Sequence, residues 1–145
     1  MYLYDQATGH LTALHDPAFL ALCYSGHEEG RNNPAMQSHP ELGPIPVGPY
    51  TIGPSFDSPT HGPVSMDLVP YPDTDTFGRS GFMLHPDSIE HPREASLGCI
   101  CTLAQQPNGK TGRQIREEIA AGQVRSLHVI AWRSDYKTDL PGKFA

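Results

Sequence analysis

Two residues that can perform nucleophilic catalysis lie fourteen positions apart in the sequence. Cys99 stands in the segment SLGCICTL, and His85 closes the short apolar run SGFMLH. A cysteine attacks as its thiolate, and a reference pKa of about 8.5 means that a base or a positive field must first remove the proton. The pair therefore suggests a thiol nucleophile and its general base, which would form a thiolate–imidazolium pair.

The backbone before Cys99 is suited to binding a polarised carbonyl. Gly98 has no side chain, so a substrate can approach the amides of Gly98 and Cys99, which predicts an oxyanion hole. Two alternatives stay open: a buried, unreactive thiol beside a surface histidine, or a zinc site made by His85, His91, Cys99 and Cys101. Structural zinc sites space paired cysteines by about two to four residues, and the Cys-x-Cys spacing is shorter, so no metal is expected.

The other two cysteines have weaker claims to a chemical role. Cys101 shares the strand phase of Cys99, so it either neighbours the site or belongs to the core. Cys23 lies in an apolar segment and is expected to be buried and inert.

Two arginines open the segment that follows the cysteines. Arg113 either pairs with Glu117, four residues further on, or holds a substrate carboxylate in two-point geometry. Arg116 is expected on a solvated helix face.

The composition narrows the class of protein. A chain of 145 residues with 37% hydrophobic and 18% charged residues is typical of one folded domain, here expected to span residues 1–145. Its net charge of −6 disfavours nucleic acid and anionic membranes as partners. No apolar run approaches the roughly 18 residues of a membrane span. The start, MYLYDQATGH, lacks the basic and apolar regions of a secretory signal peptide.

Fifteen prolines and fourteen glycines divide the chain into short pieces, which favours strands over long helices. The expected strands lie within residues 1–5, 10–14, 18–26, 49–53, 64–70, 80–85 and 124–132, and the first two form a hairpin. Residues 27–48 form a polar, proline-rich stretch, and a loop longer than about 15 residues is usually functional or disordered.

One segment, TGRQIREEIAAGQ, carries the signals of a helix. Thr111 and Gln114 fit a capping box, and Ile115 and Ile119 share one face. Gly122 is placed to end the helix in the left-handed conformation. The sequence therefore predicts a mostly β domain (β-rich α+β) with one or two short helices.

The segments SGFMLHPD and SLGCI together resemble the L,D-transpeptidase family of cell-wall enzymes, in which a strand-end histidine is followed by a variable loop and Ser-x-Gly-Cys. The resemblance implies Cys99 as nucleophile and His85 as base. Ser96 and Gly98 would flank and shape the site. It also implies an L,D-transpeptidase-like β-sandwich.

The sequence departs from the family after the base. Pro86 follows His85, where the family usually has glycine. The group that orients the imidazole therefore stays open. A backbone carbonyl near Ser96 is the first choice, and Asp87 and His91 are the alternatives.

The stretch YSG…GRNNP…GPIPVGPYTIG and the GRQIREEI segment are similar to type VI secretion effectors with L,D-carboxypeptidase and transpeptidase exchange activity. This resemblance implies cleavage of the L,D bond in peptidoglycan tetrapeptide stems, or exchange with a D-amino acid, without a cofactor. Arg31, Asn32 and Asn33 would wall the substrate groove, and Arg113 would bind substrate.

The same resemblance implies where the protein acts and with what partners. It would be secreted without a signal peptide by a secretion apparatus, act in the periplasm of a target bacterium, and be neutralised in the producer by an immunity protein. The alternatives are a non-catalytic cell-wall-binding module and a small Cys/His zinc protein.

Overall fold

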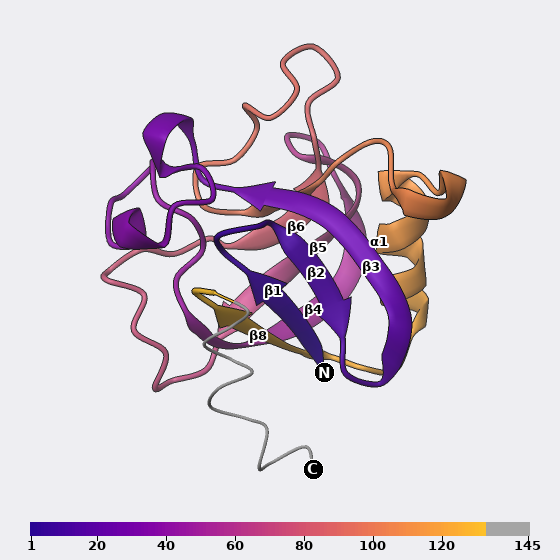
Figure 1. Ribbon diagram of the computed structural model, residues 1–145, viewed down its shortest axis with the longest axis horizontal. Helices are drawn as coiled ribbons and strands as arrows, with labels where there is room; N and C mark the ends of the chain where they lie inside the picture. Colours follow the sequence, from indigo (N-terminus) through magenta and orange to yellow (C-terminus); the bar gives the residue numbers. More distant parts are fainter. Residues whose placement is uncertain (133–145) are drawn as a thin grey trace.

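The computed structural model describes residues 1–132, whose eight strands form one closed barrel (Figure 1). The strands are β1 (Tyr2–Asp5), β2 (His10–Ala13), β3 (Asp16–Ser25), β4 (Gly48–Ser58), β5 (Gly62–Pro70), β6 (Met83–Pro86), β7 (Ile100–Thr102) and β8 (Ser126–Ile130). Around the barrel they follow the order β1-β2-β3-β7-β6-β5-β4-β8. The pairs β1–β8 and β6–β7 are parallel, and the others are antiparallel.

The prediction of a mostly β fold with a short helix is confirmed, and each segment predicted as a strand overlaps one. Because the strands close on themselves, the two layers of the expected β-sandwich are parts of one continuous sheet.

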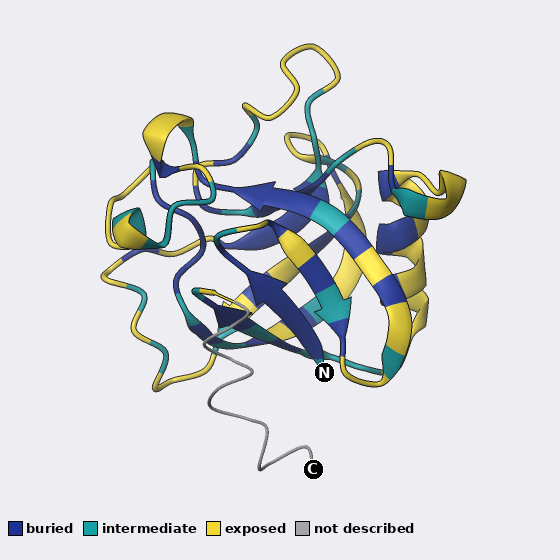
Figure 2. Ribbon diagram, in the orientation of Figure 1, coloured by how far each residue is buried: buried dark blue, intermediate teal, exposed yellow. Residues whose placement is uncertain are grey.

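Alternating side chains fill the barrel and form its core. Tyr4, Tyr50, Met66 and Val129 are completely buried there, and their sequence neighbours on the strands point the other way. Figure 2 shows the alternation as buried and exposed bands along β3. The outer face of the sheet is therefore free to carry polar residues, and the candidate site lies on that face.

The helix α1 (Gly112–Ala121) packs against β5, β6 and β7. Its predicted capping box is confirmed, because Thr111 accepts from the Gln114 amide and the Gln114 side chain accepts from the Thr111 amide. Ile115 and Ile119 join the core, as their spacing predicted. The prediction for Gly122 is wrong: its φ of −79° and ψ of 166° are extended, since the chain turns directly towards β8.

The expectation that Arg116 lies on a solvated face is also wrong. Arg116 is 3% exposed, because it follows the buried Ile115 on the helix and its side chain is turned towards the strands. Nε donates to the carbonyl of Val64 at 2.9 Å, and Nη1 donates to the hydroxyl of Thr102. Burial lowers the pKa of this guanidinium to about 10. Arg116 therefore connects the helix to β5 and β7.

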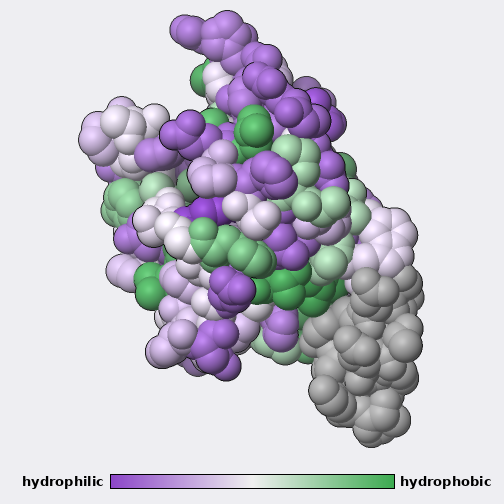
Figure 3. All heavy atoms as spheres, turned by 90° about the vertical axis from the view of Figure 1, so that its left-hand side faces the viewer, coloured by the Kyte–Doolittle hydropathy of each residue, from purple (hydrophilic) through white to green (hydrophobic). Residues whose placement is uncertain are grey.

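The long stretch between β3 and β4 is ordered. It contains the 3-10 turns η1 (Glu28–Gly30) and η2 (Pro34–Met36); a third, η3 (Pro107–Gly109), precedes α1. The buried amide of Ile45 donates to Ser25 Oγ at 2.8 Å, which fastens the stretch to the barrel. Figure 3 views the side on which η1 and η2 lie, with hydrophilic side chains gathered towards its upper end.

None of the helices within residues 1–132 is both long enough and apolar enough to cross a membrane.

Candidate active site

The site is built on the outer face of three neighbouring strands. In the parallel pair β6–β7, Leu84 lies opposite Ile100 and both face the core, so the next pair, His85 and Cys101, faces outwards. On the other side of β7, Cys101 is paired with Tyr24 of β3. Tyr24, Cys101 and His85 therefore form a row across the sheet.

A cavity of about 410 Å³ lies next to this row, and both predicted reactive residues line it. Its lining also includes His61, Arg79, Phe82, Leu97 and Gly98. The structure thus brings Cys99 and His85 to the same cavity. Because β6 and β7 are parallel, they begin at the same edge of the sheet, and Cys99 precedes β7 at that edge.

The Cys99 thiol is partly exposed at the wall of the cavity. Its Sγ donates to the carbonyl of Gly81 at 3.6 Å. Burial raises the pKa of the thiol to about 11, while the Met83 backbone amide and the Arg79 guanidinium act in the opposite direction. At neutral pH the resting residue is therefore a thiol.

The His85 ring is held by one backbone contact. Nδ1 lies 2.7 Å from the carbonyl oxygen of Pro86, and since a carbonyl only accepts, Nδ1 carries the proton and Nε2 is the free base. The orienting group is a backbone carbonyl, as first expected, but it belongs to Pro86 and not to the chain near Ser96. The ring is 2% exposed, and burial lowers the pKa of the imidazole to about 4.

These two shifts describe a neutral pair. The buried imidazole resists protonation and the buried thiol resists deprotonation, so the structure favours thiol plus imidazole over the expected thiolate–imidazolium pair.

Cys101 packs against the ring of His85. Its Sγ lies 3.6 Å from both ring nitrogens of His85, which indicates packing against the ring and not one directed hydrogen bond. The residue is completely buried, and burial raises its pKa well above the ordinary value. Cys23 is buried as predicted, and burial raises its pKa too.

Ser96 organises the turn before Cys99. Its buried hydroxyl donates to the Cys99 carbonyl at 2.6 Å, and its oxygen accepts from the amides of Gly26 at 2.9 Å and Gly98 at 3.1 Å. The Gly98 amide is therefore occupied. The Cys99 amide has no acceptor within residues 1–132, which leaves it as the available half of the predicted oxyanion hole.

Gly98 allows Arg79, a residue that the sequence analysis did not identify, to approach closely. Its φ of +137° is strained for any other residue, and a Cβ there would collide with the guanidinium of Arg79. Arg79 is 9% exposed, and all its hydrogen bonds within residues 1–132 go to backbone carbonyls, those of Gln37, Gly43, Pro44 and Leu97. No sequence spacing links Arg79 to Cys99, because their proximity depends on the folded loops.

His61 is a second missed residue. Its ring centroid lies 4.8 Å from that of His85, and its Nδ1 lies 2.9 Å from Thr60 Oγ1. It sits in the turn between β4 and β5, where a positive charge on it would further lower the pKa of His85. Nothing in the sequence of this turn predicts that His61 contacts His85 of β6.

The loop that joins β6 to β7 is anchored by one buried hydroxyl. Tyr24 donates to Asp87 Oδ1 at 2.6 Å and accepts from the amide of Ala95 at 2.9 Å. Asp87 also accepts from the amides of Ser88 and Arg93. Asp87 therefore positions the loop, and the hydrogen bond to His85 comes from elsewhere.

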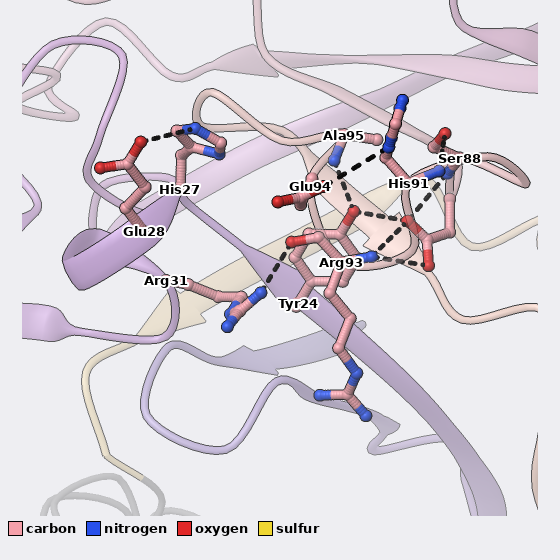
Figure 4. Close-up of polar contacts among 10 residues, drawn as sticks. Tyr24, His27, Glu28, Arg31, Ser88, His91, Arg93, Glu94 and Ala95 are labelled. Carbon is pink, nitrogen blue, oxygen red and sulfur yellow. Dashed lines mark hydrogen bonds and ion pairs between the residues drawn. The ribbon is translucent and has the colours of Figure 1, made fainter.

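His91 lies on the surface of the same loop, where its Nδ1 is 3.8 Å from Glu94 (Figure 4). It is separate from His85, so it neither orients the ring nor completes the zinc alternative. Within residues 1–132, no three His, Cys, Asp or Glu side chains come together as potential metal ligands.

The four predicted substrate-binding residues lie outside the 410 Å³ cavity. Arg31 donates to the carbonyl of Arg93 at 2.8 Å (Figure 4), while Asn32 accepts from the Ser25 amide and Asn33 caps η2. Arg113 lines a second cavity, of about 660 Å³, which His61 also lines. Their role in binding substrate stays a prediction.

A family model described as the Tlde1 domain matches residues 21–127, well over half of the chain. The chain belongs to the Tlde1 domain family. This is a family of type VI secretion effectors, and membership indicates peptidoglycan-modifying activity. Neither a curated protein nor a solved structure matches the chain. The matched segment of this Tlde1 domain contains the whole 410 Å³ cavity.

Tyr24→Phe is expected to loosen the loop without opening the barrel. It deprives Asp87 of a donor and Ala95 of an acceptor, so the free energy of unfolding should fall by about 1.5–3 kcal/mol in urea titrations. Amide exchange at Ala95 should accelerate. Tyr4→Phe is the control, because that equally buried hydroxyl has no partner within residues 1–132. Equal losses in both variants would contradict the anchoring role.

Proposed function

We propose that this Tlde1 domain cleaves the L,D bond of peptidoglycan tetrapeptide stems with Cys99 as nucleophile and His85 as base. The observation that carries the proposal is that Cys99 and His85 line the same cavity. The carbonyl of Pro86 holds the proton on Nδ1 of His85, which leaves Nε2 to accept another. Family membership supports peptidoglycan as the substrate.

The reaction proceeds through a thioester. His85 Nε2 takes the thiol proton while Sγ of Cys99 attacks the carbonyl carbon of the residue before the terminal D-amino acid. The Cys99 amide stabilises the oxyanion, since the Gly98 amide is directed to Ser96. On collapse the C–N bond breaks, and His85 returns the proton to the departing amine. Water then hydrolyses the thioester, or a D-amino acid amine attacks it.

The proposed setting follows from the family. Type VI effectors are delivered into target cells, and the periplasm is where peptidoglycan is found. We propose that an immunity protein in the producing cell covers the cavity beside Cys99, because blocking that opening excludes the stem.

Cys99→Ala should abolish the conversion of tetrapeptide to tripeptide stems, because it removes the attacking atom. Cys101→Ser should retain most of the turnover, since Cys101 only packs against the base. Mass spectrometry of purified muropeptides after incubation measures both products. Turnover that survives Cys99→Ala but is lost in a folded Cys101→Ser variant would reverse the assignment. A protein that binds stems and never converts them would be a wall-binding module.

The pH dependence should report the buried base. His85 accepts a proton only when neutral, and burial lowers its pKa to about 4, so kcat/KM should decline only as the pH falls through about 4. An exposed imidazole would instead titrate at about 6.5. Rates on a synthetic tetrapeptide between acidic and neutral pH measure the midpoint. A midpoint at or above the exposed value would argue against a desolvated base.

Toxicity should depend on the compartment. Expression in the cytoplasm of a susceptible bacterium should be tolerated, while fusion to an export signal should cause swelling, failed division or lysis, because only the periplasm contains the proposed substrate. Growth curves and microscopy record the outcome, and exported Cys99→Ala is the control. Equal toxicity in both compartments, or toxicity of the exported Cys99→Ala variant, would exclude wall chemistry as the cause.

A further inference from the structure

Arg79 places a positive charge at the candidate cavity without a negative partner. The residue lies between β5 and β6, is 9% exposed, and lines the same cavity as Cys99. Its four Nη hydrogen bonds end on neutral backbone carbonyls. Glu41 also lines the cavity, but neither it nor any other carboxylate within residues 1–132 forms an ion pair with Arg79.

The orientation of the guanidinium leaves one donor for a ligand. Nη1 and Nη2 each have two carbonyl acceptors, so their hydrogens are all used. Nε–H has no acceptor within residues 1–132, and it is not among the polar atoms that the fold encloses without a partner. The ring of Phe82 lies 5.7 Å from the guanidinium carbon and also lines the cavity. Arg79 is thus held in place at the wall of the cavity, and its Nε–H is the donor that remains for a ligand.

We propose that Arg79 binds the carboxylate of the terminal D-amino acid, the part of the stem that leaves when the L,D bond breaks. This inference rests on the proposed function. A largely desolvated cation is costly unless an anion compensates it, and a charge-assisted hydrogen bond to a carboxylate supplies that compensation. Burial lowers the pKa of the guanidinium, which is the expected sign for a charge that lacks a partner.

The covalent structure of the substrate places the terminal carboxylate close to the scissile carbonyl. Only the amide nitrogen and one α-carbon separate the scissile carbonyl from the terminal carboxylate. A group that binds the carboxylate must therefore share the cavity of the nucleophile. Arg79 meets that condition, whereas Arg113 lines the other cavity and is already 3.6 Å from Glu117.

Alkylation of Cys99 tests carboxylate binding without requiring turnover. Iodoacetate and iodoacetamide both react when the thiolate attacks the methylene carbon and iodide leaves, so the ratio of their rates cancels the pKa of the thiol. The ratio should be higher for folded protein than for protein unfolded in urea. In Arg79→Gln it should fall by about tenfold, the size of a lost hydrogen bond to a charged group. Peptide mass spectrometry assigns the label to Cys99.

Matched variants separate charge recognition from structural support. Arg125→Gln is the control, because Arg125 also donates to backbone carbonyls, those of Val124, Gly53 and Ile119, and does not line the cavity. Its ratio should equal that of the unmodified protein. Arg79→Lys, which keeps the charge, should retain part of the preference. If Arg79→Gln does not fold, the folded and unfolded ratios of the unmodified protein decide, and equal ratios overturn the proposal.

Turnover of two tetrapeptides connects the cation to the stem. One peptide ends in a carboxylate and the other in a carboxamide, and kcat/KM should favour the carboxylate by about tenfold or more in the unmodified protein. Arg79→Gln should remove this preference. Equal slowing of both peptides would make Arg79 a structural clamp and overturn the inference. If the unmodified protein converts neither peptide, the proposed function fails, and the alkylation ratio still decides whether Arg79 binds a carboxylate.

Discussion

The parallel pairing of β6 with β7 is the constraint on which the site depends. Parallel neighbours need a connection that returns along the sheet, and here an irregular loop supplies it in place of a helix. The return brings Cys99, which precedes β7, to the edge where β6 begins, and the register sets His85 beside Cys101. Tyr24 and Asp87 anchor the loop itself, while the pairing of β6 with β7 fixes the separation of its two ends.

Desolvation then determines what kind of chemistry this geometry can perform. The same burial lowers the pKa of His85 and raises that of Cys99, so each group rests in its neutral form. The proposed base needs a neutral imidazole with Nδ1 fixed, as Pro86 provides, and the proposed nucleophile would ionise only during attack.

Local patterns in the sequence identified most of the fold and part of the site. The capping box at Thr111 and the alternation of the strands depend on residues that are close in the chain, so they could be predicted. The contact of Pro86 with His85 depends on backbone geometry. Arg79 and His61 belong to two separate connections between strands, so their spacing in the sequence could not predict that they lie at the site. Closure of the barrel likewise depends on a long-range pair, β1 with β8.

Gly98 connects the nucleophile to the cation that approaches it. With its positive φ, Gly98 donates its amide hydrogen to the hydroxyl oxygen of Ser96. This hydrogen bond fixes the backbone just before Cys99. The missing side chain leaves the space that the Arg79 guanidinium occupies. Gly98 thus meets two requirements. The turn must be tight enough to expose the sulfur of Cys99, and it must leave room beside it for the guanidinium of Arg79. A substitution there would disturb both at once, so the two roles are separated only by changing Arg79 or Ser96.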